Sequence, residues 1–211
     1  MKKLITLIIL ISLSLNSNGQ NSFEGLIKFS TKITTTHIAP KGFQKKLSDK
    51  YGDSLIMYYS KTGDFRRVHL NSSKFGVDSQ LFISKKAKIY LTKKNSSQID
   101  SVDVKENSLK STSTRKINNQ KIIGLDCECY KIKAVSVYGQ NVTLNYCFSS
   151  KTPSIDPKLY SDHKDFYLNE YYKFAKRPYL KFSIETPDFK IIYLATELIE
   201  KEIEKEIFKL K

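Results

Sequence analysis

The sequence predicts a mainly β protein built on one long antiparallel sheet that curls on itself. Runs of four to eight residues rich in β-branched and aromatic side chains recur along the chain, with polar turns between them. Short turns join most neighbouring runs, which predicts sequential hairpins and about nine or ten strands. A meander of that length must curl or close to protect its edges.

Alternating polarity identifies the first strand, "FEGLIKFSTKI". Side chains on a strand alternate between faces, so the residues on one face are Phe23, Gly25, Ile27, Phe29 and Ile33. Four hairpins follow, with turns at Thr62-Gly63-Asp64, near Lys85-Lys86, around Tyr138-Gly139 and at Pro187-Asp188. The segment "QIDSVDVKE" alternates weakly, which indicates an edge strand.

Two segments interrupt the strands. Residues 41–52 form a short helix or a loop, and residues 161–175 are predicted to be helical. The helical stripe consists of Tyr167, Tyr171 and Phe174, with Leu168 and Ala175 alongside. Ser161 or Asp162 can cap the start of this helix. Packed on the concave face of a curved sheet, it either fills the core or shares a pocket for an apolar ligand with the sheet.

The first residues predict export. A positive "MKK" precedes "LITLIILISLSL", an apolar run too short to span a bilayer, so a membrane anchor is disfavoured. We therefore expect residues 1–19 to be a signal peptide, cleaved between Gly19 and Gln20. Residues 20–211 then form a single β-rich domain without a transmembrane segment, located in the periplasm, the cell envelope or outside the cell.

The charge of the chain does not predict nucleic-acid binding. The net charge is +15, but lysine dominates the excess and the lysines are scattered. Arginine, which reads bases and phosphates with two hydrogen bonds, occurs only at Arg66, Arg67, Arg115 and Arg177. We expect no nucleic-acid partner, and contact with anionic lipid or glycan surfaces is the more favoured role of the charge.

Three cysteines lie in one predicted hairpin, at Cys127, Cys129 and Cys147. The first two are two positions apart on a strand, with one residue between them, which puts them roughly 6–7 Å apart and does not suit a disulfide between them. A two-residue turn at Tyr138-Gly139 would place Cys147 on the opposite face from Cys129. A longer turn or a bulge would place them opposite each other. The sequence therefore leaves two possibilities open. Cys147 forms a disulfide with Cys129 or with Cys127, or all three cysteines are free thiols that pack in the core.

The sequence offers no catalytic constellation. The three histidines lie in separate elements, and there is no G-x-S-x-G, P-loop, G-x-G-x-x-G or H-E-x-x-H motif. The cysteine spacing does not suit a redox turn or a zinc site either. We therefore predict no enzyme activity, no metal site and no cofactor.

Three further patterns carry a resemblance. The first strand fits G-x-[IV]-x-[FY], the segment from Ile122 through Gly124 and Cys127 to Tyr130 fits I-x-G-x-x-C-x-x-[YA], and the last strand ends in F-x-[LI]. In these features the chain resembles the GLPGLI-type family and its relatives, which are exported bacterial proteins of unknown function. The resemblance implies an architecture similar to outer-membrane lipoprotein carriers: a half-open β-barrel with one or two helices on its concave side.

Together these observations predict an exported envelope protein that holds a lipid or another apolar group on the concave face. The expected pocket residues are Phe29, Met57, Tyr59, Phe65, Phe82, Tyr90, Phe166, Tyr167 and Tyr171. A non-enzymatic interaction module with a self-filled core, bound to an envelope protein, is the alternative. A hydrolase or redox enzyme comes third. The oligomeric state is left open.

Overall fold

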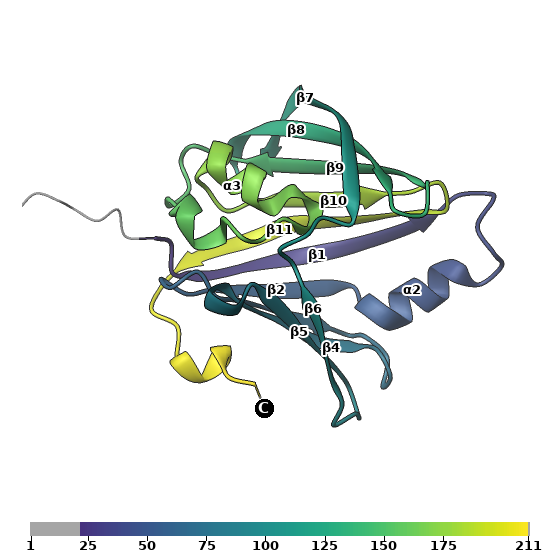
Figure 1. The fold of residues 1–211 in the computed structure, drawn as a ribbon, viewed down its shortest axis with the longest axis horizontal. Coiled ribbons are helices and arrows are strands. Elements are labelled where there is room, and N and C mark those ends of the chain that lie inside the picture. The colour runs from purple at the N-terminus through teal and green to yellow at the C-terminus, as the bar shows by residue number, and fades with distance from the viewer. Residues whose placement is uncertain (1–21, 211) are drawn as a thin grey trace, which may run out of the picture.

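The fold is one curved antiparallel sheet that contains every described strand (Figure 1). The computed structural model describes residues 22–210, so the predicted signal peptide lies outside the described residues. The strands are β1 Gly25–Thr35, β2 Ser54–Tyr59, β3 Phe65–Leu70, β4 Val77–Ile83, β5 Lys88–Lys93, β6 Ile99–Asp103, β7 Leu109–Ile122, β8 Leu125–Ser136, β9 Asn141–Phe148, β10 Lys181–Glu185 and β11 Phe189–Glu200. Their order across the sheet is β6-β5-β4-β3-β2-β1-β11-β10-β9-β8-β7, so the expected count of strands was too low.

The sheet is a half-open barrel, because its edge strands β6 and β7 do not pair with each other. These two edges are consecutive in the chain, and the segment between them crosses in front of the sheet (Figure 1). Val104 fixes this crossing, since its N–H donates to the carbonyl of Ala87 at 3.0 Å and its own carbonyl accepts from Lys164 N–H at 2.7 Å. The chain thus partly closes the opening that the sheet leaves.

Among the described residues, two α-helices accompany the sheet, α2 at Phe43–Tyr51 and α3 at Leu168–Ala175. Helix α2 shows that residues 41–52, predicted to be a short helix or a loop, are mostly helical. Helix α3 begins later than predicted, so Ser161 and Asp162 do not cap it. The 3₁₀ turns are η1 Ser84–Lys86, η2 Pro157–Tyr160, η3 Asp165–Tyr167 and η4 Lys205–Phe208. Of these, η3 lies within the predicted helix, and η2 ends just before it.

Sequence patterns missed β7, the second edge of the sheet. Most of its side chains are exposed, so no apolar alternation marks it. It joins β8 through Ile123 and Gly124, which both have positive φ, at 45° and 78°. Two consecutive positive φ values are typical of a tight hairpin turn, and glycine adopts the second without steric cost. The sequence pattern favours one strand over residues 121–135, which is wrong, because this turn divides the segment between β7 and β8.

The core lies on the concave side of the sheet. Aromatic rings gather there, including Phe65 of β3 against Phe82 of the neighbouring strand β4, with centroids 5.0 Å apart. Phe82 also contacts Tyr160 of η2, at 6.1 Å. A smaller apolar cluster around Ile33, Leu47 and Ile191 attaches α2 to the far end of the sheet.

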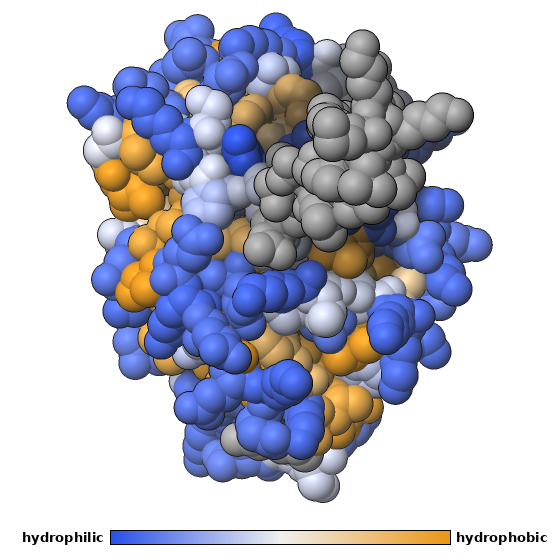
Figure 2. Space-filling view, turned by 90° about the vertical axis from the view of Figure 1, so that its left-hand side faces the viewer, coloured by the Kyte–Doolittle hydropathy of each residue, from blue (hydrophilic) through white to orange (hydrophobic). Residues whose placement is uncertain are grey.

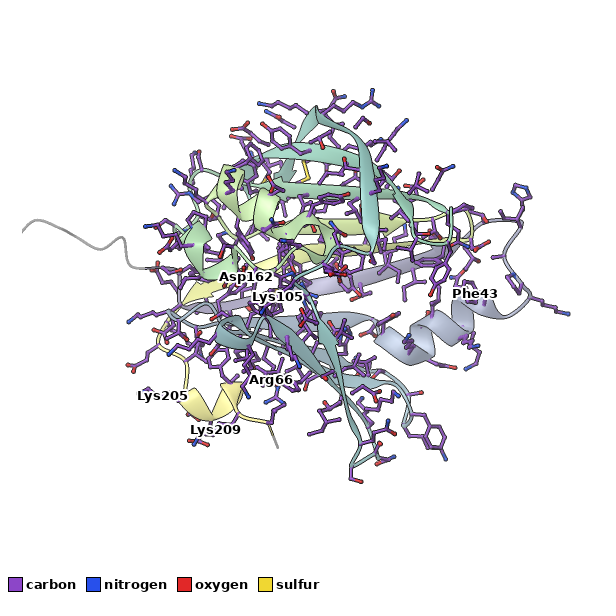
Figure 3. The ribbon with its side chains drawn as sticks, viewed as in Figure 1. Phe43, Arg66, Lys105, Asp162, Lys205 and Lys209 are labelled. Atoms are coloured by element: carbon purple, nitrogen blue, oxygen red, sulfur yellow. A yellow bond between two sulfur atoms is a disulfide. The ribbon has the colours of Figure 1, made fainter. Side chains whose placement is uncertain are left out.

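The C-terminal segment covers part of the outer face of β3 and β4. Figure 3 shows Arg66 beside this segment, which carries Lys205 and Lys209. Arg66 donates to the carbonyls of Ile207 and Lys209 at 2.8 and 3.2 Å, and to Ser79 Oγ at 3.1 and 3.2 Å. Its hydrogen bonds are therefore satisfied inside the fold.

The surface seen in Figure 2 is mainly hydrophilic, with hydrophobic residues in separate patches. Exposed ion pairs such as Lys28–Glu197 and Lys116–Glu128 contribute little stability, typically less than about 1 kcal/mol each. Across residues 22–210, no helix has the length and apolar character needed to cross a membrane.

Candidate ligand-binding site

Five of the predicted pocket residues fill the core instead of lining a cavity. Phe29, Met57, Tyr59, Phe65 and Phe82 are each at most 1% exposed and belong to one packed cluster. They lie on the concave side, as the alternation of their strands predicts, but neighbouring rings occupy the space in front of them. Helix α3 contributes Tyr172 to this packing, with its ring 4.3 Å from that of Tyr160.

A cavity of about 380 Å³ lies between α3 and strands β7–β9, and we call it the α3 cavity. Its lining is Ser111, Thr114, Tyr130, Ile132, Tyr146, Tyr167, Glu170, Tyr171 and Phe174. Tyr146 stacks on Tyr171 with centroids 4.7 Å apart, and Tyr130 meets Phe174 edge-on at 4.2 Å. The walls are therefore largely aromatic, and the volume lies within the usual range of small-molecule sites, roughly 300–1,000 Å³.

Two smaller cavities, the central cavities, adjoin each other deeper in the concave side and measure about 140 and 150 Å³. They share the lining residues Arg67, Gln80, Phe166, Tyr179 and Phe182. Tyr146 lines both the first central cavity and the α3 cavity. Its hydroxyl donates to the carbonyl of Phe166 at 2.8 Å, which fixes the ring where these two cavities meet.

The turn before α3 directs two aromatic residues into different cavities. Phe166 lines both central cavities and Tyr167 lines the α3 cavity. Both have left-handed backbone, with φ of 52° and 57°. This conformation costs a non-glycine residue roughly 1–3 kcal/mol. Tyr167 is held there by its hydroxyl, which donates to the carbonyl of Leu109 at 2.7 Å.

Tyr90 lines neither the α3 cavity nor the central cavities. Its neighbours Ile89 and Leu91 line the first central cavity. Since side chains alternate along β5, Tyr90 lies on the opposite face. There the ammonium group of Lys86 lies 5.7 Å from the centroid of its ring, within the limit of roughly 6 Å for a cation–π contact.

The central cavities hold polar groups that the sequence did not single out. His163 is 2% exposed and lines the first central cavity, and His69 is 3% exposed and lines the second. Burial lowers the pKa of His163 to about 3 and that of His69 to about 4, and the nearby charge of Arg67 acts in the same direction. Both imidazoles are therefore neutral at pH 7.

Asp165 also lines the first central cavity. Burial raises the pKa of its carboxyl group, although Ser108 Oγ donates to Oδ1 at 3.3 Å and opposes that shift. No carboxylate lines the second central cavity among the described residues. The two cavities thus differ in charge although they share Arg67.

A disulfide joins Cys129 to Cys147, which face each other in the β8–β9 pairing. Cys127 is a free, buried thiol. Burial raises the pKa of Cys127, which is the reverse of what a reactive thiolate requires. Within residues 22–210, no group of three or more His, Cys, Asp and Glu side chains is placed to hold a metal ion.

Comparisons with known proteins add little. No protein-family model matches the chain, and no curated protein sequence matches it. The resemblance to the GLPGLI-type family therefore stays a prediction. Among solved structures, the chain is similar to a "putative outer membrane lipoprotein-sorting protein domain" from Vibrio parahaemolyticus, with a TM-score of 0.41 and 7% identity over 93% of this chain and 94% of that one. So weak a likeness carries no argument about function.

Proposed function

We propose that this protein is an exported envelope protein that holds an apolar ligand in the α3 cavity. The observation that carries the proposal is the cavity itself, about 380 Å³ between α3 and β7–β9. Its aromatic rings offer large apolar contact area, while Ser111, Thr114 and Glu170 supply the few polar groups typical of a binding site. Export rests on the N-terminal sequence pattern, and the bound group is a lipid or another apolar molecule.

The structure suggests a direct way to block the cavity. Thr114 lines it from the edge strand β7, yet Thr114 is exposed, so a larger side chain at this position disturbs little of the core. Ser113, next to it on β7, pairs with Lys133 instead of Ile132 and does not line the cavity. Ser113→Trp therefore adds the same indole to the same strand on the other face.

We expect the apolar dye N-phenyl-1-naphthylamine to bind the wild-type protein saturably at one site. Thr114→Trp should weaken that binding by roughly tenfold or more, because the indole occupies apolar space that the dye would bury. Ser113→Trp should bind as the wild type does. A fluorescence titration measures all three affinities. Absence of saturable binding to the wild type, or equal loss in both variants, would contradict the proposal.

The alternative function is an interaction module whose concave side is filled by its own side chains. It is favoured by the five predicted pocket residues that pack in the core. Under that alternative the α3 cavity is a packing defect, and neither tryptophan variant changes binding of the dye.

A further inference from the structure

Two adjacent arginines on β3 have different environments. Arg66 lies on the outer face, and its side chain donates to two carbonyls and to Ser79. Arg67 lies on the concave side and lines both central cavities. The outer arginine therefore has a structural role that the inner one does not share.

The guanidinium of Arg67 has no anionic partner among residues 22–210: no Asp or Glu oxygen lies within 4.0 Å of it. It donates to Tyr179 OH at 3.1 Å and, at 3.4 Å, to Gln80 Oε1. It also lies over the ring of Phe65, 4.8 Å from the centroid. Its Nε is buried and makes no hydrogen bond. All its partners are neutral, although arginine stays charged at any pH at which proteins fold.

The surroundings of Arg67 favour one negative charge on an apolar body. The second central cavity provides apolar wall from Leu55, Phe182, Ile184, Phe189 and Ile191. The Asp165 carboxylate in the first cavity interacts with Arg67 electrostatically but does not form an ion pair with it. A buried charge that faces apolar walls without a carboxylate in contact is costly, and an arginine fork matches a carboxylate through two parallel hydrogen bonds. Because both buried histidines are neutral, Arg67 is the only cation among the lining residues of either cavity.

We propose that the central cavities bind a ligand that carries a single carboxylate on a short apolar chain, with the carboxylate paired to Arg67. Its apolar chain lies along the walls of the second central cavity. The carboxylate of Asp165 in the first cavity disfavours a doubly charged group such as a phosphate. This inference goes beyond the proposed function, since it concerns a different pair of cavities and a charged ligand.

Octanoate and octanamide test the proposal on the wild-type protein, since they have the same shape and differ in charge. Titrations followed by backbone amide chemical shifts give both dissociation constants. We expect octanoate to bind roughly ten- to a hundredfold more tightly, as a hydrogen bond to a charged partner in a largely apolar site implies. Equal affinities, or no saturable shift with octanoate, would overturn the proposal without any variant being needed.

Variants then locate the carboxylate. Arg67→Met should remove the preference for octanoate, and Arg67→Lys should retain part of it, because lysine keeps the charge and loses the fork. Arg115→Met removes an equal charge from the exposed strand β7 and should leave the preference intact. If the preference survives in Arg67→Met, Arg67 is not the anion partner.

The tryptophan variant separates this inference from the proposed function. Thr114→Trp should leave octanoate binding unchanged while it blocks the dye. Loss of octanoate binding in Thr114→Trp but not in Arg67→Met would place the carboxylate in the α3 cavity and overturn the inference alone. If the wild type binds octanoate more tightly than octanamide but does not bind the dye, only the proposed function is contradicted.

Discussion

Mild acid is expected to destabilise this protein strongly. His163 and His69 are buried and neutral in the folded state, with pKa values of about 3 and 4, whereas an unfolded histidine titrates near 6.5. Between pH 6.5 and 4 the unfolded chain therefore binds two protons that the folded chain does not. The free energy of unfolding should fall as pH falls, with a slope that approaches about 2.7 kcal/mol per pH unit.

This loss is comparable with the whole stability of a typical domain, roughly 5–15 kcal/mol, so we expect unfolding near pH 4. Stability is complete above pH 6.5, where both states carry neutral imidazoles. The raised pKa of Asp165 acts in the opposite direction and offsets part of the loss, because the folded state keeps that proton to higher pH. Urea unfolding at a series of pH values, followed by circular dichroism, measures the slope.

His163→Phe provides the decisive variant for the acid effect. Both ring nitrogens of His163 lack hydrogen-bond partners, and its ring packs on Phe82 with centroids 4.7 Å apart. A phenylalanine keeps that packing and takes up no proton, so the slope should fall to about half. His37→Gln on the surface should keep the wild-type slope, because both buried imidazoles remain. An unchanged slope in His163→Phe would mean that another group governs the acid response.

Reduction of the disulfide is expected to cost about 3 kcal/mol, because Cys129 and Cys147 close a loop of 18 residues in sequence. The bridge joins β8 to β9. The next pair of residues along these two strands, Tyr130 and Tyr146, lines the α3 cavity from the other face of the sheet. Reduction should therefore lower the urea midpoint and weaken dye binding together.

Alkylation provides the control for the disulfide. Under denaturing conditions without reductant we expect one modified thiol, Cys127, and after reduction three. Cys127→Ala should keep its sensitivity to reductant, since the bridge does not involve that residue. A Cys127→Ala protein that no longer responds to reductant would show that the bridge runs through Cys127 instead.

Periodicity predicted the strands that bury one face. The alternation in β1 placed Ile27 and Phe29 in the core correctly, because each strand there has one buried side. The same reasoning failed for β7, whose two faces are both largely exposed at the sheet edge. The cysteine pairing stayed open because one residue in the turn near Gly139 decides which face Cys147 takes.

The central cavities were beyond sequence reasoning for a different reason. Alternation along β3 places Arg67 and His69 on the same face as the core residue Phe65. It does not reveal whether a carboxylate from elsewhere meets Arg67, because that depends on strands distant in sequence. Likewise, the sequence around an aromatic strand residue such as Tyr59 does not reveal whether its side chain lines a cavity or packs in the core.

The central claim is that the α3 cavity takes an apolar ligand. A crystal structure of the protein with 1-bromonaphthalene tests it most directly, since the anomalous signal of bromine locates the molecule independently of the protein atoms. We predict a bromine peak within the α3 cavity, between the rings of Tyr130 and Tyr171. A peak confined to the outer surface, or none in a crystal saturated with the compound, would contradict the claim.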